Sequence, residues 1–146
     1  MAVEVSKVDV WVGEIEDRCG GLSEKIEAVA EAGANLEFVI ARRASDRPGY
    51  GLVFVAPLHG NAQIRAAKAA GLMKDPRVHT LRIEGPSKLG FGAKITHAIA
   101  EAGINMRGMS GTALGRRCAI YVSFDNPADT ARAKRVLMKA LNNRSK

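Results

Sequence analysis

The sequence is poor in the features that mark several large classes of protein. It has only two cysteines, Cys19 and Cys118, among 146 residues. That is too few for a disulfide scaffold, so we expect free thiols and a cytoplasmic location. No apolar stretch approaches the roughly 18 residues that a membrane-spanning helix needs, and we expect no membrane partner. The first residues do not join a basic segment to an apolar one, so no signal peptide is expected.

Residues that carry out catalysis or bind metals are also sparse. The three histidines, His59, His79 and His97, share no ligand spacing with one another or with the cysteines, so neither a metal nor a cofactor is expected. No Ser/His/Asp or Cys/His arrangement points to a nucleophile. We therefore predict a protein that is not an enzyme, with a small ferredoxin-like enzyme as the alternative.

Charge is present in quantity, but it is unevenly placed along the chain. Residues 1–76 hold 9 lysines and arginines and 11 aspartates and glutamates, a net charge of −2. Residues 77–146 hold 13 and 4, a net charge of +9. Such asymmetry indicates an acidic partner, nucleic acid, or attraction between unlike halves. No basic run reaches the five or six like charges of a binding tail, which favours an ordinary solvated basic surface.

A repeated segment defines the organisation of the chain. Residues 30–36, AEAGANL, return as residues 100–106, AEAGINM. Each copy predicts a strand, a glycine-containing loop, a helix, two further strands joined by a turn, and a second helix. The predicted strands cover residues 8–15, 36–41 and 51–56, then 78–83, 106–112 and 119–124. This order predicts an α+β fold of two tandem ferredoxin-like (βαββαβ) units, residues 1–76 and 77–146, with antiparallel sheets and helices on one face.

Neither unit contains an obvious fourth strand. Residues 72–73, or residues from Val78 onward, are the candidates in the first unit, and only residues 142–146 remain in the second. The fourth strands are therefore short, missing or exchanged between the units. Segments 38–41 and 52–56 are apolar on both faces, which indicates that the sheet face away from the helices is covered. Packing of the two halves or a homodimer satisfies this requirement.

Each predicted first helix is preceded by a glycine-centred loop and followed by Gly-x-Asn. The first loop consists of Asp17, Arg18, Cys19, Gly20, Gly21 and Leu22, and the second of Ser87, Lys88, Leu89, Gly90 and Phe91. The later asparagines are Asn35 and Asn105. This pattern resembles the ACT domain, a small regulatory module that binds amino acids and whose loop usually reads Asp-x-Pro-Gly-x-Leu. Cysteine replaces the proline in the first copy, and the second copy departs further.

The resemblance implies a tandem ACT-domain protein that binds a free amino acid as its effector at interfaces between units. Such a protein acts as a sensor or separate regulatory subunit for an enzyme or regulator on another chain. Backbone N–H groups at a helix start suit a carboxylate, and Gly20 and Gly90 allow a close approach. Asp17, or a carbonyl, is the candidate partner for the ammonium.

Several alternatives stay open at these positions. The glycines can serve only the turn, and Asn35 and Asn105 either bond the ligand or the loop, or only cap the helix end. The second loop contains no carboxylate, and its Leu89 and Phe91 add apolar bulk, so this site is either vestigial or suited to a more apolar ligand.

Two further functions compete with amino-acid binding. One is a dimerisation or scaffold protein without a small ligand. The other is an RNA-recognition module, because residues 10–15 and 49–53 imitate parts of its strand motifs. However, Leu52 and Val55 stand where aromatic residues stack on bases, and the imitation lies in the acidic half. We therefore do not expect a nucleic-acid partner.

Overall fold

The computed structural model describes residues 3–142 and divides them into two compact units. The first, which we call the acidic unit, comprises residues 9–75 and carries 8 lysines and arginines against 10 aspartates and glutamates. The second, the basic unit, is discontinuous and joins residues 76 onward to the residues up to Val8. The division therefore differs from the predicted ranges 1–76 and 77–146 at the N-terminal end.

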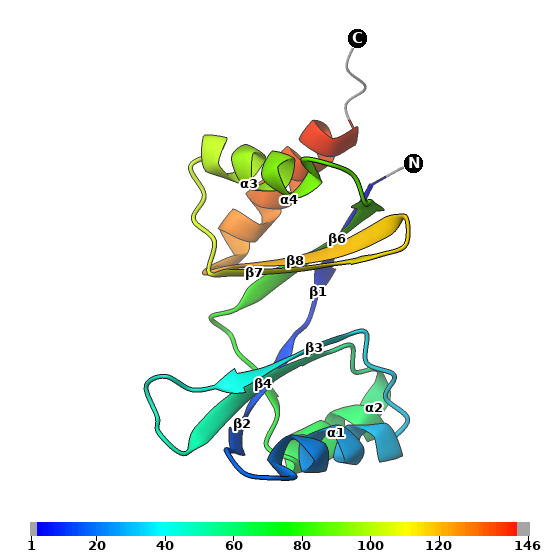
Figure 1. Cartoon of the computed structure of the whole chain (residues 1–146), viewed down its shortest axis with the longest axis vertical. Helices are drawn as coiled ribbons and strands as arrows, with labels where there is room; N and C mark the ends of the chain where they lie inside the picture. The colour runs from blue at the N-terminus through cyan, green and yellow to red at the C-terminus, as the bar shows by residue number, and fades with distance from the viewer. Residues whose placement is uncertain (1–2, 143–146) are drawn as a thin grey trace. The chain divides into compact units, whose positions relative to one another are not determined.

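The acidic unit is one four-stranded antiparallel sheet with two helices on one face (Figure 1). Its elements are β2 (Trp11–Glu16), α1 (Gly21–Glu31), β3 (Phe38–Arg43), β4 (Tyr50–Ala56), α2 (Gly60–Ala69) and β5 (Met73–Lys74). The strand order is β3-β4-β2-β5. The helices bury one apolar face against the sheet, and the core consists of Trp11, Val29, Val53, Val55, Leu58, Ala67 and Leu72.

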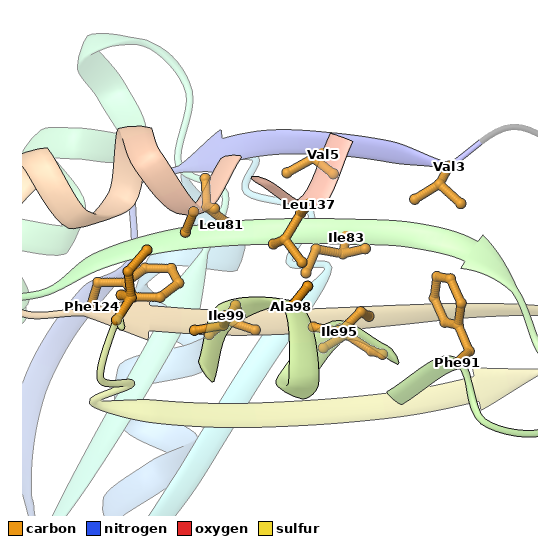
Figure 2. Packing of buried hydrophobic residues seen from close by; sticks show 14 residues of the cluster. Val3, Val5, Leu81, Ile83, Phe91, Ile95, Ala98, Ile99, Phe124 and Leu137 are labelled. Carbon is orange, nitrogen blue, oxygen red and sulfur yellow. The ribbon is translucent and has the colours of Figure 1, made fainter. Parts of the chain in front are cut away.

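The basic unit has the same layers. Its elements are β1 (Glu4–Val8), β6 (His79–Pro86), α3 (Phe91–Glu101), β7 (Gly108–Leu114), β8 (Arg117–Phe124) and α4 (Pro127–Asn142), with strand order β1-β6-β8-β7. Figure 2 shows its core, in which Ile95 and Ile99 of α3 and Leu137 of α4 lie against Ile83 of β6. Asn126 caps the start of α4, because its Oδ1 accepts a 2.8 Å hydrogen bond from the Asp129 N–H.

The fourth strands of the two sheets have different origins. In the acidic unit β5 is two residues long and pairs with β2. In the basic unit the corresponding place beside β6 is taken by β1, with Val5 opposite Ile83. The predicted strand over 8–15 is consequently wrong as one element: Val8 ends β1, and Trp11 begins β2 in the other sheet.

Across residues 3–142 the fold is thus α+β, with two antiparallel sheets and four helices. This arrangement is consistent with an ACT-like, ferredoxin-type fold, and it confirms the predicted α+β class with antiparallel sheets. Among the same residues no helix is long and apolar enough to cross a membrane.

Candidate functional site

The first predicted loop makes a tight turn into α1. Gly20 precedes the helix with φ +86°, a left-handed conformation that favours glycine. The Glu24 N–H donates to the Gly20 carbonyl at 3.1 Å, and the Gly21 N–H donates to the Arg18 carbonyl at 3.1 Å. A Cβ on Gly21 would lie 2.3 Å from the Glu16 carbonyl oxygen, so any side chain here would force the backbone to shift. Both glycines therefore serve the turn itself.

Arg18 lies across this turn, which we call the α1 corner (residues 17–24), and is held by two carboxylates. Its Nε is 2.7 Å from Glu16 Oε2, and its Nη2 donates to both Glu24 oxygens at 2.9 and 2.8 Å. The hydrogen bonds to Glu24 and then to Glu16 raise the pKa of the Arg18 guanidinium above its ordinary value. Glu24 also stands in the first turn of α1, where a negative charge offsets the helix dipole. The corner thus already contains its own anions.

The other residues of the first loop are placed differently. Asp17, the predicted partner for an ammonium, forms an ion pair with Arg43 of β3 at 2.8 Å. Its backbone N–H donates to the Gly49 carbonyl at 3.0 Å, which ties the loop to the β3–β4 turn. Cys19 is exposed, and Leu22 is 36% exposed on the helix surface.

The second loop makes a similar turn into α3, which we call the α3 corner (residues 87–94). The space around this turn is open. Gly90 has φ +83°, and the Lys94 N–H donates to its carbonyl at 2.9 Å. A Cβ built on Gly90 or on Gly92 meets nothing within 4 Å. The first turn of α3 contains no acidic residue, and Lys88 and Lys94 are exposed beside it. This corner combines free space, helix N–H groups and positive charge.

The two apolar residues of the second loop differ in burial. Phe91 is 6% exposed and turns into the core, where a Cβ on Gly85 would lie 2.6 Å from its Cζ. Leu89 is fully exposed. The Ser87 N–H donates to the Arg116 carbonyl at 2.8 Å and fixes the start of the loop to the β7–β8 turn. Phe91 is therefore a core residue, and only Leu89 adds apolar surface to the corner.

The asparagines do not join these corners within their own unit. Asn35 follows the C-terminal end of α1 and Asn105 that of α3, and both are exposed. Each helix has 11 residues and is therefore about 16 Å long. Each asparagine thus lies at the far end of the helix from the glycine that begins it.

Two features of the corners were not predicted from the sequence. The clamp of Arg18 by Glu24 joins residues six apart across a turn, and the only signal for it was the clustering of opposite charges in residues 14–24. Lys94 follows the predicted loop by three residues, and its position in the first turn of a helix is the signal that was missed. In the described part of the chain, no group of three or more His, Cys, Asp or Glu residues is arranged to hold a metal ion.

Neither a family model nor a curated protein matches this chain. Solved structures do match its fold. Protein BT0572 from Bacteroides thetaiotaomicron is 16% identical, with a TM-score of 0.76, over 92% of this chain and 89% of that one. The ligand-free regulatory subunit of aspartate kinase from Thermus thermophilus is 18% identical, with a TM-score of 0.65, over 96% and 97%. Aspartate kinase from Clostridium acetobutylicum is 14% identical, with a TM-score of 0.62, over 97% of this chain and 34% of that enzyme.

Proposed function

We propose that the chain is a non-catalytic regulatory protein, built from two tandem ACT-type units, that binds a free amino acid as its effector. The observation that carries this proposal is the match in fold to an isolated regulatory subunit of aspartate kinase over nearly the full length of both chains. We infer that the protein works in the cytoplasm as a homodimer and acts on an enzyme or regulator carried by another chain.

The likeness between the two units supports their origin as tandem copies. Both α1 and α3 contain 11 residues, and both follow a glycine with nearly the same left-handed φ, +86° and +83°. Gly33 and Gly103, which follow the two helices, also have positive φ. These coincidences of backbone geometry match the sequence repeat residue by residue.

The effector's carboxylate has its best partner at the start of α3. The space beside Gly90 and Gly92 is open at the first turn of α3, where the positive end of the helix dipole favours an anion, and Lys88 and Lys94 are exposed nearby. At α1 the same group would meet the carboxylates of Glu16 and Glu24 around Arg18. The described second loop offers only backbone carbonyls and the Ser87 hydroxyl to the ammonium.

A substitution that fills this corner tests the site. Gly92→Val places a branched side chain in space that is open beside the α3 N-terminus, without a positive φ to strain it. Isothermal titration calorimetry with the amino acid that binds the parent protein should show at least about a tenfold loss of affinity, or 1.4 kcal/mol. Gly108→Val in β7 is the control, since its Cβ also meets nothing within 4 Å. Equal affinities in both variants would place the ligand elsewhere.

A scaffold function without a ligand is the second candidate. It is favoured by the way Arg18 covers the α1 corner and Phe91 fills space under the α3 corner. RNA binding is not favoured, because Trp11, the aromatic residue of the first-strand imitation, is 3% exposed in the core and has no face free for a base.

A further inference from the structure

The two sheets of the described residues end in four edge strands, and one of these differs from the others in its residues. The edges are β1 and β7 in the basic unit and β3 and β5 in the acidic unit. An edge strand exposes unpaired backbone groups, and proteins protect it with charged side chains, with proline or by keeping it very short. β5 has only two residues, β3 ends in two arginines, and β1 contains Glu4 and Lys7. β7 has none of these protections.

The β7 edge is long, uncharged and open. The strand has seven residues, GMSGTAL, all exposed except the half-buried Ser110. Because only alternate residues of an antiparallel strand bond to a given neighbour, about half of the N–H and C=O groups of β7 point away from β8. In the part of the chain that the structure describes, no other strand pairs with that side. The edge can therefore receive one more strand.

The sequence of β7 is complementary to itself when two copies run antiparallel. Gly111 is the central residue of the strand. With a two-fold axis at Gly111, Met109 lies opposite Ala113 of the other copy, and Leu114 lies opposite Gly108. Each large apolar side chain thus meets a small residue, and no like charges face each other across the strands. Met109 is 43% exposed and Leu114 is 84% exposed, so both have apolar surface to bury.

We propose that β7 of one chain pairs antiparallel with β7 of a second copy, with Gly111 at the two-fold axis. The remaining pair in this register places Ser110 opposite Thr112, and it occurs twice. Cross-strand hydroxyl pairs of this kind stabilise a sheet. The contact uses the same surface on both copies, so it closes at two chains. It needs residues of the basic unit alone.

This inference rests on the homodimer in the proposed function and names its contact. The basic unit holds 14 lysines and arginines against 5 aspartates and glutamates, so two basic units repel each other. Backbone hydrogen bonds and apolar side chains hold the pair together against this repulsion. A contact one strand wide is at the small end of specific interfaces, so we expect a micromolar dissociation constant. It should fall as added salt screens the repulsion.

Charges placed on the two hydroxyl residues test the register. Thr112→Lys puts two lysines on either side of the axis, and Ser110→Glu does the same with two glutamates. Each variant alone should raise the dissociation constant in sedimentation velocity at least about fivefold. An equimolar mixture of T112K and S110E should form a heterodimer within about threefold of the parent affinity, because the introduced lysine and glutamate then lie directly opposite each other.

Ser6→Lys is the matched control. Ser6 is exposed on β1, the opposite edge of the same sheet, and lies in the same cross-strand row as Ser110. Circular dichroism establishes that every variant is folded. The proposal is overturned if the parent stays monomeric up to about 1 mM. It is also overturned if S6K weakens the dimer as much as T112K, or if the mixture of T112K and S110E does not associate.

Hydrogen exchange locates the contact independently. When the parent is diluted from dimer to monomer, the amides of β7 should lose protection while those of the acidic unit's edge strand β3 keep theirs. A dimer that leaves the exchange of β7 unchanged on dilution overturns the proposal. A monomeric parent whose β7 is protected only by an added protein also overturns it, because the edge then receives a different partner.

Amino-acid binding is measured separately on the same proteins by thermal shift. A dimer that T112K and S110E weaken and their mixture restores, in a protein that no amino acid stabilises, supports this contact and removes the effector role. A monomeric parent that an amino acid stabilises supports the effector role and removes the contact.

Discussion

Two glycines in the first turns of the helices differ in what surrounds the missing side chain. A Cβ on Gly21 would lie 2.3 Å from the Glu16 carbonyl oxygen, whereas one on Gly92 meets nothing. We expect Gly21→Ala to lower the free energy of unfolding by about 1–3 kcal/mol, because the backbone has to shift. Gly92→Ala should raise it by about 0.5–1 kcal/mol, because alanine restricts the unfolded chain. Urea unfolding measures both, and equal midpoints would contradict the tight turn at α1.

The charges at the two corners predict different effects on effector affinity. Lys94 stands in the first turn of α3 without an acidic neighbour in that turn, whereas Arg18 is bound by Glu16 and Glu24. We expect Lys94→Glu to weaken amino-acid binding by about tenfold in calorimetry, because it cancels the positive field of the helix start. Arg18→Gln should leave the affinity within about twofold. The reverse pattern would move the carboxylate to the α1 corner.

At the scale of elements, one contact locks the end of β6 to the start of α3. Phe91 Cζ would be 2.6 Å from a Cβ on Gly85. Gly85→Ala should therefore destabilise the basic unit by about 1–3 kcal/mol. Phe91→Leu removes the opposing ring, so the double variant should lose clearly less than the sum of the two single losses. Additive losses in thermal unfolding would show that the ring and the strand are not in this contact.

The elements that could be predicted from the sequence are those fixed by local signals. Helices α1 and α3 follow from apolar spacing and from glycines at their ends, and the α4 cap follows from Asn126-Pro127. Strand β1 could not be predicted, because Glu4–Val8 is largely polar and its partner β6 lies more than 70 residues away. Its sheet position depends on tertiary contacts of Val3 and Val5 with the basic unit's core.

For the candidate site too, only the roles that depend on local sequence could be predicted. The turn glycines Gly20 and Gly90 were predicted, since their role is local. The pairing of Asp17 with Arg43 and the burial of Phe91 against Gly85 depend on residues from other strands. The spacing of residues along the chain does not reveal such contacts. Which side chains fill each corner could therefore be learned only from the structure.

At the scale of the whole molecule, the two units differ in how they depend on the N-terminal strand. Val5 is 8% exposed and packs in the core of the basic unit, whereas residues 9–75 form the other unit without β1. Deletion of residues 1–8 should therefore lower the thermal midpoint of the basic unit and leave that of the acidic unit nearly unchanged. Hydrogen exchange resolves the two, with β6 and β8 losing protection while β2 and β4 keep it. Equal loss in both sheets would contradict this division.

The regulatory role depends on a free amino acid stabilising the folded chain. The most direct measurement is the thermal midpoint of the full chain with each of the twenty amino acids in turn. We predict that at least one, at 100 times its dissociation constant, stabilises the fold by about 2.7 kcal/mol and raises the midpoint, while Gly92→Val reduces this stabilisation to about 1.4 kcal/mol or less at the same concentration. A well-folded protein whose midpoint none of the twenty changes at millimolar concentration would contradict the account.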